Sequence, residues 1–302
     1  MTPEAKVLLE EYLNENCTYT LDTMRTMLFL DCGVKVDTST ISRHLKGMLF
    51  TVKQVRVEPT TCNSDINIEK RRVFAVKLKE HQDAGNCIVY YDETNYNIYL
   101  NRLRGRSRKG ERAVLSLPPS KGANLQIQCA VSSSIGLVTY QLEHGSIRME
   151  KNAAFVEEIY KAVKASQEFR NFFQGKKVVI VLDNAPAHRQ TEDRVTEHED
   201  MELLRLGPYS PMCNPIEGCF SVLKANIKRH LAIYREEICD RSRQLDNNGD
   251  VMTLAGRQMR VLERAAKAEM KCMTSVLVSR MELHCSKAVN AAAEGIAMVY
   301  GK

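Results

Sequence analysis

The sequence predicts a mixed α/β protein with a separate helical segment at its N-terminus. Three observations lead to this prediction. Residues 1–50 carry apolar side chains at helical spacing, and residues 87–205 contain several short apolar or alternating runs that are typical of strands. A run of β-branched residues, Lys177–Asp183, is typical of a strand buried on both faces. With 302 residues, the chain is long enough for about two domains.

Composition narrows the class of protein. The chain is 44% hydrophobic and 26% charged, as expected for a soluble globular protein. The N-terminus lacks the apolar run of a signal peptide, and the longest aliphatic run near the motifs, Val178–Leu182, is far shorter than a membrane span, so we expect no membrane partner. Ten cysteines without a C-x-x-C pair indicate a reduced, intracellular protein and argue against a disulfide framework.

The first 50 residues predict three short helices. We expect them at Pro3–Asn14, at Thr20–Asp31 before the helix stop Gly33, and at Ser39–Lys46 after a cap at Asp37 or Thr38. A helix-turn-helix has this form, and Arg43 and His44 on its third helix would then contact DNA. A small bundle that packs on the rest of the chain is the alternative. The segment holds five Lys or Arg against seven Asp or Glu, a balance that favours neither strongly.

Residues 51–84 form a basic connector with one expected helix, Ile68–Lys79, and residues 85–234 then show an α/β pattern. The pattern first predicts strand Cys87–Asp92 and strand Tyr96–Leu100, paired as a hairpin across Glu93–Asn95. A second hairpin follows, formed by strands Leu125–Ser132 and Gly136–Leu142 with a turn near 133–135. The remaining expected elements are, in order, helix Asn152–Ser166, strand Lys177–Asp183, a helical region, strand Met201–Arg205 and helix Pro215–Tyr234. Strands before the first helix pair antiparallel, which matches an RNase H-like mixed sheet flanked by helices better than a doubly wound one. Residues 235–302 form a helical C-terminal extension, with helices at Leu254–Lys271 and Met273–Met281.

Three acidic residues stand where a two-metal nuclease would need them. Asp92 and Asp183 end apolar strands, and Glu217 lies just inside a helix start. Two divalent cations about 3.5–4 Å apart need carboxylates that converge from different elements. Alternation along the strand puts Asp92 on the face of Tyr90 and turns Glu93 to the opposite face.

Each acid also has a structural interpretation. Asp183 suits a turn cap, and Asp92 alone is ambiguous beside Glu93. Asn214 is a good N-cap residue, so Glu217 at N3 could complete a capping box. Asn184 and His188 near Asp183, together with Asn214, would orient neighbouring groups around the acids.

Basic residues gather in two places outside the first segment. Residues 101–112 carry six Lys or Arg against one Glu, a surplus that suits a polyphosphate partner or a solvated loop. The second place is the helix that follows Glu217. The candidate DNA contacts are Arg102, Arg104, Arg106, Arg108, Lys109, Arg112, Lys224 and Lys228.

From about Phe74 to His230, the chain resembles the DDE catalytic domain of mariner-like transposases. The motifs that carry this resemblance are Tyr91–Thr94, Lys109–Arg112, Val181–His188 and Pro208–Glu217, with 33 residues between Asp183 and Glu217. Residues 38–80 also resemble the second helix-turn-helix unit and linker of the family, whereas its first such unit has no counterpart here.

The resemblance implies that Asp92, Asp183 and Glu217 form a triad that holds two Mg²⁺ or Mn²⁺ ions. It implies a DNA endonuclease and strand transferase that acts on transposon ends and target DNA, allows for a homodimer, and works in the nucleus of a eukaryote or otherwise in the cytoplasm or nucleoid. An inactive or domesticated DNA-binding or partner-binding derivative is the alternative. A cellular RNase H-like nuclease is a third, and it predicts cleavage without strand transfer.

Overall fold

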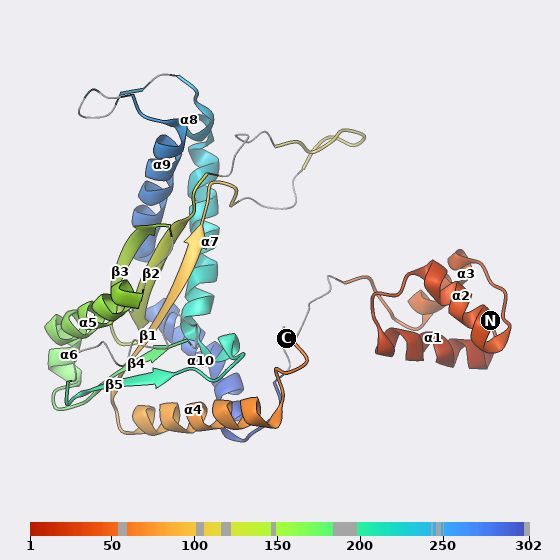
Figure 1. Ribbon diagram of the computed structural model, residues 1–302, viewed down its shortest axis with the longest axis horizontal. Coiled ribbons are helices and arrows are strands. Elements are labelled where there is room, and N and C mark those ends of the chain that lie inside the picture. The colour runs from red at the N-terminus through yellow and green to blue at the C-terminus, as the bar shows by residue number, and fades with distance from the viewer. Residues whose placement is uncertain are drawn as a thin grey trace. The chain divides into compact units, whose positions relative to one another are not determined.

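A computed structural model describes residues 1–53, 59–100, 106–115, 122–145, 149–183, 198–242, 244–245, 249 and 251–298. The chain divides into two compact units, Met1–Pro59 and Thr60–Lys302. The ribbon in Figure 1 displays the elements of each unit.

The first unit consists of the three predicted helices. They are α1 (Pro3–Glu15), α2 (Leu21–Cys32) and α3 (Thr38–Gly47). Side chains of Thr2, Thr20 and Asp37 accept hydrogen bonds from the first turns, which fixes each start. Gly33 ends α2 in the left-handed region, at φ 67°. Apolar residues of all three helices, including Leu9, Leu28 and Ile41, form one small core, so the helical prediction for this segment is confirmed.

The second unit begins with α4 (Asp65–Asp83), which is longer than the helix expected in the connector. Its Phe74, Ala75 and Leu78 are buried in the main core of this unit. The basic connector is therefore in large part a packed helix of the second unit.

A five-stranded sheet lies at the centre of the second unit, with strand order β3-β2-β1-β4-β5. The strands are β1 (Cys87–Tyr96), β2 (Leu125–Ser132), β3 (Gly136–His144), β4 (Val178–Leu182) and β5 (Met201–Arg205). β1 pairs antiparallel with β2 and parallel with β4. The sheet is the mixed one that the sequence predicts, and β1 is its central strand.

The predicted hairpin across Glu93–Asn95 is wrong. β1 continues through these residues, and Thr94 and Tyr96 pair with Ile127 and Leu125 of β2. The segment has no glycine that could take up the positive φ of a tight hairpin turn, and the β-branched Thr94 favours the extended backbone. The other predicted hairpin is confirmed, since β2 pairs antiparallel with β3.

Helices cover both faces of the sheet (Figure 1). On one face, α5 (Met149–Ala165) and α6 (Gln167–Phe172) pack on Cys87, Val89 and Tyr91 of β1. On the other face, Ile88 and Tyr90 pack with helices from later in the chain. These are α4, α7 (Pro215–Ile233), α9 (Leu254–Glu269) and α10 (Ser275–Ala293), with α8 (Arg235–Cys239) following α7.

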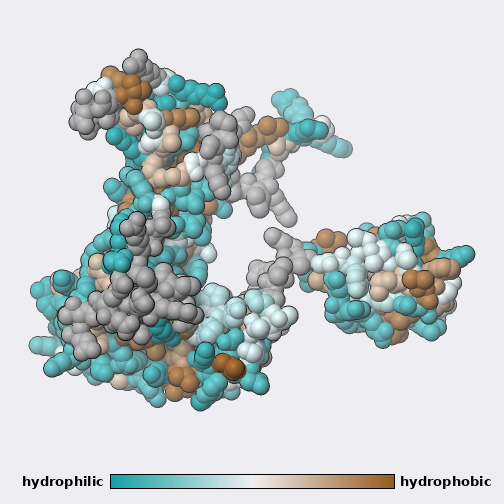
Figure 2. All heavy atoms as spheres, viewed as in Figure 1, coloured by the Kyte–Doolittle hydropathy of each residue, from teal (hydrophilic) through white to brown (hydrophobic). Residues whose placement is uncertain are grey.

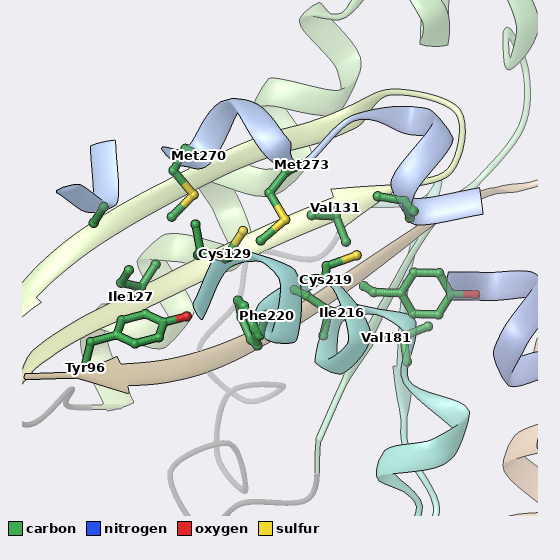
Figure 3. Close-up of a cluster of buried hydrophobic side chains, with 14 of the residues drawn as sticks. Tyr96, Ile127, Cys129, Val131, Val181, Ile216, Cys219, Phe220, Met270 and Met273 are labelled. Atoms are coloured by element: carbon green, nitrogen blue, oxygen red, sulfur yellow. The ribbon is translucent and has the colours of Figure 1, made fainter. Parts of the chain in front are cut away.

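The C-terminal helices share this second core. Figure 3 shows Val181 of β4 and Cys129 of β2 near Ile216 and Phe220 of α7, with Met270 and Met273 alongside. Met270 belongs to the short 3-10 turn η3 (Met270–Cys272). Residues 254–293 thus complete the core on which the start of α7 rests.

The surface in view is mostly hydrophilic, and its apolar side chains lie in small separate patches (Figure 2). Of the helices that the structure describes, none combines the length and the hydropathy needed to span a membrane.

Candidate active site

The register of the two central strands brings Asp92 and Asp183 side by side. Tyr90 of β1 lies opposite Val181 of β4 in the parallel pair. Asp92 and Asp183 follow two residues later on each strand, and neighbouring strands are about 4.8 Å apart. Because side chains alternate, both acids fall on the face of Tyr90 and Val181, where the start of α7 packs.

Two donors hold the carboxylate of Asp92. The backbone N–H of Glu93 donates to Oδ1 at 2.7 Å, and Nδ2 of Asn214 donates to Oδ2 at 3.0 Å. Asn214 immediately precedes α7, so this bond ties the helix that carries Glu217 to the central strand.

Glu93 lies on the other face, as alternation predicts. The hydroxyl of Tyr91 donates to its Oε1 at 3.0 Å. Nε2 of Gln128 lies 2.7 Å from that hydroxyl and 2.7 Å from Oδ1 of Asn152, and all three supporting side chains are buried. Sequence reasoning missed this network because Gln126 and Gln128 alternate with apolar residues, a pattern typical of an exposed strand face.

Asp183 is the last described residue before a gap in the described chain, directly after β4. Asn184 and His188, the expected orienting groups, lie outside the described residues. Whether they contact the acids stays a prediction.

The capping-box interpretation of Glu217 is wrong. Asn214 occupies the N-cap position of α7, but its side chain makes no capping hydrogen bond because it reaches Asp92 instead. The backbone N–H of Asn214, which a capping box would offer to Glu217, donates to the carbonyl of Pro211. Pro211 lies in the 3-10 turn η2 (Pro211–Cys213) that leads into the helix.

The electrostatics of the three acids are coupled. Burial, together with the charges of Glu217 and Asp183, raises the pKa of Asp92 from 3.8 to about 8, against the opposing effect of the Glu93 N–H. Burial also raises the pKa of Glu217; the charge of Lys224 opposes this increase, and the charge of Asp183 adds to it. Negative charge is thus concentrated around Asp92, Asp183 and Glu217, and the positive charge of Lys224 offsets it only in part.

The donors in this place fit a hard divalent cation, because carboxylate and amide oxygens are the ligands that Mg²⁺ and Mn²⁺ prefer. The buried Oδ1 of Asn214, beside Asp92, has no hydrogen-bond partner among the described residues and is a further oxygen available there. Within the described part of the chain, which includes Asp92, Asp183 and Glu217, no group of three or more His, Cys, Asp or Glu side chains is arranged so that it could hold a metal ion. Side chains of catalytic sites often tighten only when the site is loaded.

The expected DNA contacts fall into three groups. Lys224 lies over the ring of Tyr96, 5.5 Å from its centroid, and its charge acts on Glu217; Lys228 follows one turn later on α7. Arg106, Arg108, Lys109 and Arg112 are exposed, whereas Arg102 and Arg104 lie outside the described residues. In the first unit, Arg43 is exposed and His44 half-buried on α3.

Comparison with known proteins adds a family match to this geometry. The family described as DDE superfamily endonuclease matches residues 87–239, which include all three acids. No curated protein matches the chain.

Solved structures of the Mos1 transposase are similar in fold. The Mos1 strand transfer complex matches with a TM-score of 0.64 and 16% identity over 100% of this chain and 81% of that one. The Mos1 mariner paired end complex with Mn matches with a TM-score of 0.65 and 17% identity, over 98% and 80%. The corresponding complex with Mg gives 0.59 and 18%, over 97% and 80%. At these identities, the likeness shows a shared fold.

Proposed function

The chain belongs to the DDE superfamily endonuclease family, and on that premise we propose that it is a metal-dependent DNA endonuclease and strand transferase of the transposase type. The observation that carries the proposal is the parallel register of β1 and β4, whose last pair, Tyr90 and Val181, precedes Asp92 and Asp183 by two residues on each strand. The electrostatic coupling of both with Glu217 supports a single acidic site.

In this proposal, Asp92, Asp183 and Glu217 hold two divalent cations, Mg²⁺ or Mn²⁺. Such a pair activates the attacking water or 3′-hydroxyl and stabilises the leaving oxygen in an in-line displacement. Asn214 keeps the carboxylate of Asp92 oriented by its bond to Oδ2. The raised pKa of Asp92 means that this side chain gives up a proton when the site fills.

Basic side chains on two elements would hold the DNA. Lys224 and Lys228 follow Glu217 along α7, and the exposed segment that contains Arg106, Arg108, Lys109 and Arg112 adds further positive charge. Arg43 and His44 on α3 would contact DNA from the first unit. Phosphate contacts of this kind position the protein without reading bases.

The names of the similar structures support the choice of substrate. Those Mos1 proteins are described in a strand transfer complex and in paired end complexes with Mn and with Mg. By analogy, we propose transposon ends and target DNA as partners and a homodimer that acts on two ends. The place of action would be the nucleus in a eukaryote and otherwise the cytoplasm or nucleoid.

Incubation with supercoiled plasmid that carries candidate terminal repeats tests the proposal. We expect nicking and joined products with Mg²⁺ or Mn²⁺ and none with EDTA. Asp183→Asn should abolish nicking and leave DNA binding intact or slightly tighter, since it removes one negative charge that faces phosphates. Glu80→Gln, an exposed acid on α4, is the matched control. Equal nicking by Asp183→Asn and the control would refute the proposed site, and DNA binding without any nicking would favour the DNA-binding derivative.

A further inference from the structure

The solvent-facing side of α10 carries a row of basic side chains. Arg280, His284 and Lys287 are spaced by four and three residues, so they lie on one face of the helix, and all three are exposed. Among the described residues, none of the three takes part in a salt bridge. Positive charge without a protein partner on one helix face suits a polyanionic ligand.

The length of this basic row matches a short stretch of a nucleic-acid strand. Seven residues of helix, from Arg280 to Lys287, rise about 10 Å at 1.5 Å per residue. One strand within a duplex advances about 3.4 Å per nucleotide along the axis, and an unpaired strand can extend further, so the row spans at most about three phosphates. His284 can donate an N–H to a phosphate oxygen in either protonation state.

A hollow of about 740 Å³ lies beside the basic row, between α10 and the start of α7. Met212, Met281 and Leu283 give it an apolar wall, and Glu217, His284 and Lys287 also line it. Leu283 is 74% exposed, so its side chain is accessible to a ligand in the hollow. The volume is in the range of sites that bind small molecules.

The hollow is fixed relative to the acids. Gly218, next to Glu217, packs so closely on α10 that a Cβ there would collide with the sulfur of Met281. On the other side of α10, Glu282 accepts a hydrogen bond of 2.8 Å from the hydroxyl of Tyr90, on the strand that carries Asp92. The wall of the hollow and the candidate active site therefore belong to one rigid arrangement.

We propose that this surface binds an unpaired stretch of DNA next to the phosphodiester that is cut, with phosphates on Arg280, His284 and Lys287 and a base against Met281 and Leu283. The inference rests on the proposed function. An apolar wall favours a single strand over a duplex, because paired bases are stacked inside the helix and only an unpaired base can lay its face on protein side chains.

The test compares two fluorescent DNAs that differ only in a short single-stranded overhang. Binding of the full chain is measured by anisotropy in EDTA, so that cleavage plays no part. We expect the wild type to prefer the overhang. The triple variant Arg280→Gln, His284→Gln, Lys287→Gln should lose this preference and flatten the salt dependence of overhang binding by about 1.4 log units per log unit of salt, since Arg280 and Lys287 each contribute about 0.7.

Leu283→Ser, which adds no charge, separates the apolar contact from the charges. It should weaken overhang binding about tenfold, a size expected for loss of one base contact, and leave the blunt duplex unchanged. Lys161→Gln, an exposed cation on α5 across the sheet, is the control and should change neither. Circular dichroism checks that each variant folds.

Equal loss on both DNAs, or no loss in the triple variant, would overturn the inference. That result is distinct from failure of the proposed function, which is judged by metal-dependent nicking of plasmid by the wild type.

Discussion

Asp92 and Glu93 are adjacent carboxylates on β1 with opposite surroundings. Asp92 lies among other acids, and its burial and their charges raise its pKa to about 8. Glu93 accepts a hydrogen bond from Tyr91 within a network of buried neutral side chains. The two side chains therefore differ although they are adjacent in sequence, because alternation along the strand turns them to opposite faces of the sheet. Asp92 lies near other negative charges, whereas Glu93 belongs to a hydrogen-bond network of neutral side chains. This difference is why we propose Asp92, and not Glu93, as a metal ligand.

The largest expected effect is on nicking. Asp92→Asn should reduce metal-dependent nicking about 1000-fold or more, because metal catalysis supplies several kcal/mol of transition-state stabilisation and each 1.36 kcal/mol is a factor of ten. Glu93→Gln keeps the shape on the other face and should stay within about tenfold of wild type. A plasmid-nicking time course measures the rate of each variant. A larger loss of nicking in Glu93→Gln than in Asp92→Asn would mean that Glu93, and not Asp92, acts in the site.

The second prediction concerns pH and the metal-free protein. The folded-state pKa of Asp92 lies near 8, above the value of 3.8 for the unfolded chain. Its contribution to stability is therefore fully present below about pH 4 and is lost as pH rises through about 8. In EDTA, the free energy of unfolding should fall by roughly 1–3 kcal/mol between about pH 5 and pH 8.

Urea unfolding at several pH values measures this slope. Asp92→Asn should remove most of it and be the more stable protein at the upper end. An unchanged slope in that variant would show that Asp92 ionises normally.

The third prediction tests the hydrogen-bond network in which Glu93 takes part. Tyr91→Phe removes the hydroxyl that Glu93 and Gln128 share, so a largely buried network loses hydrogen bonds. It should lower the free energy of unfolding by about 1–3 kcal/mol. The thermal shift produced by Mn²⁺ should stay the same. Loss of that thermal shift would mean that the hydrogen-bond network around Tyr91 and Glu93 also affects metal binding.

The smallest effect on stability is expected at Asn214. Asn214→Ser restores a good helix cap, and its side chain is too short to reach Asp92. The free energy of unfolding should change by less than about 1 kcal/mol, while nicking falls about tenfold through loss of one hydrogen bond to a charged group. Normal nicking in this variant would show that the bond to Asp92 does not orient it.

Much of the fold follows from local patterns. Val178–Leu182 is fully buried, as its β-branched run predicts, and the caps at Thr20 and Asp37 predict where α2 and α3 start. The polar residues at 93–95 suggest a turn when they are considered in a short window of sequence. Pairing with β2, a partner about 30 residues away, decided the backbone there.

Local motifs single out the candidate acids of the site but not the residues that support them. Motifs locate Asp92, Asp183 and Glu217, since each has a local signature. The bond from Asn214 to Asp92 joins residues 122 positions apart, and Asn214 has the local signature of a helix cap. The hollow beside α10 likewise depends on packing between distant segments, which no window of sequence contains.

The close approach of Gly218 to Met281 has a consequence for sequences related to this one. A gene copy interrupted before residue 275 would still encode all three acids and the whole matched region, 87–239. It would lose the helix on which the start of α7 rests and the Glu282 carboxylate that meets Tyr90. A count of functional gene copies that relies on the three acids alone would therefore include copies whose protein cannot fold correctly. The presence of the segment that encodes α10 is the better criterion.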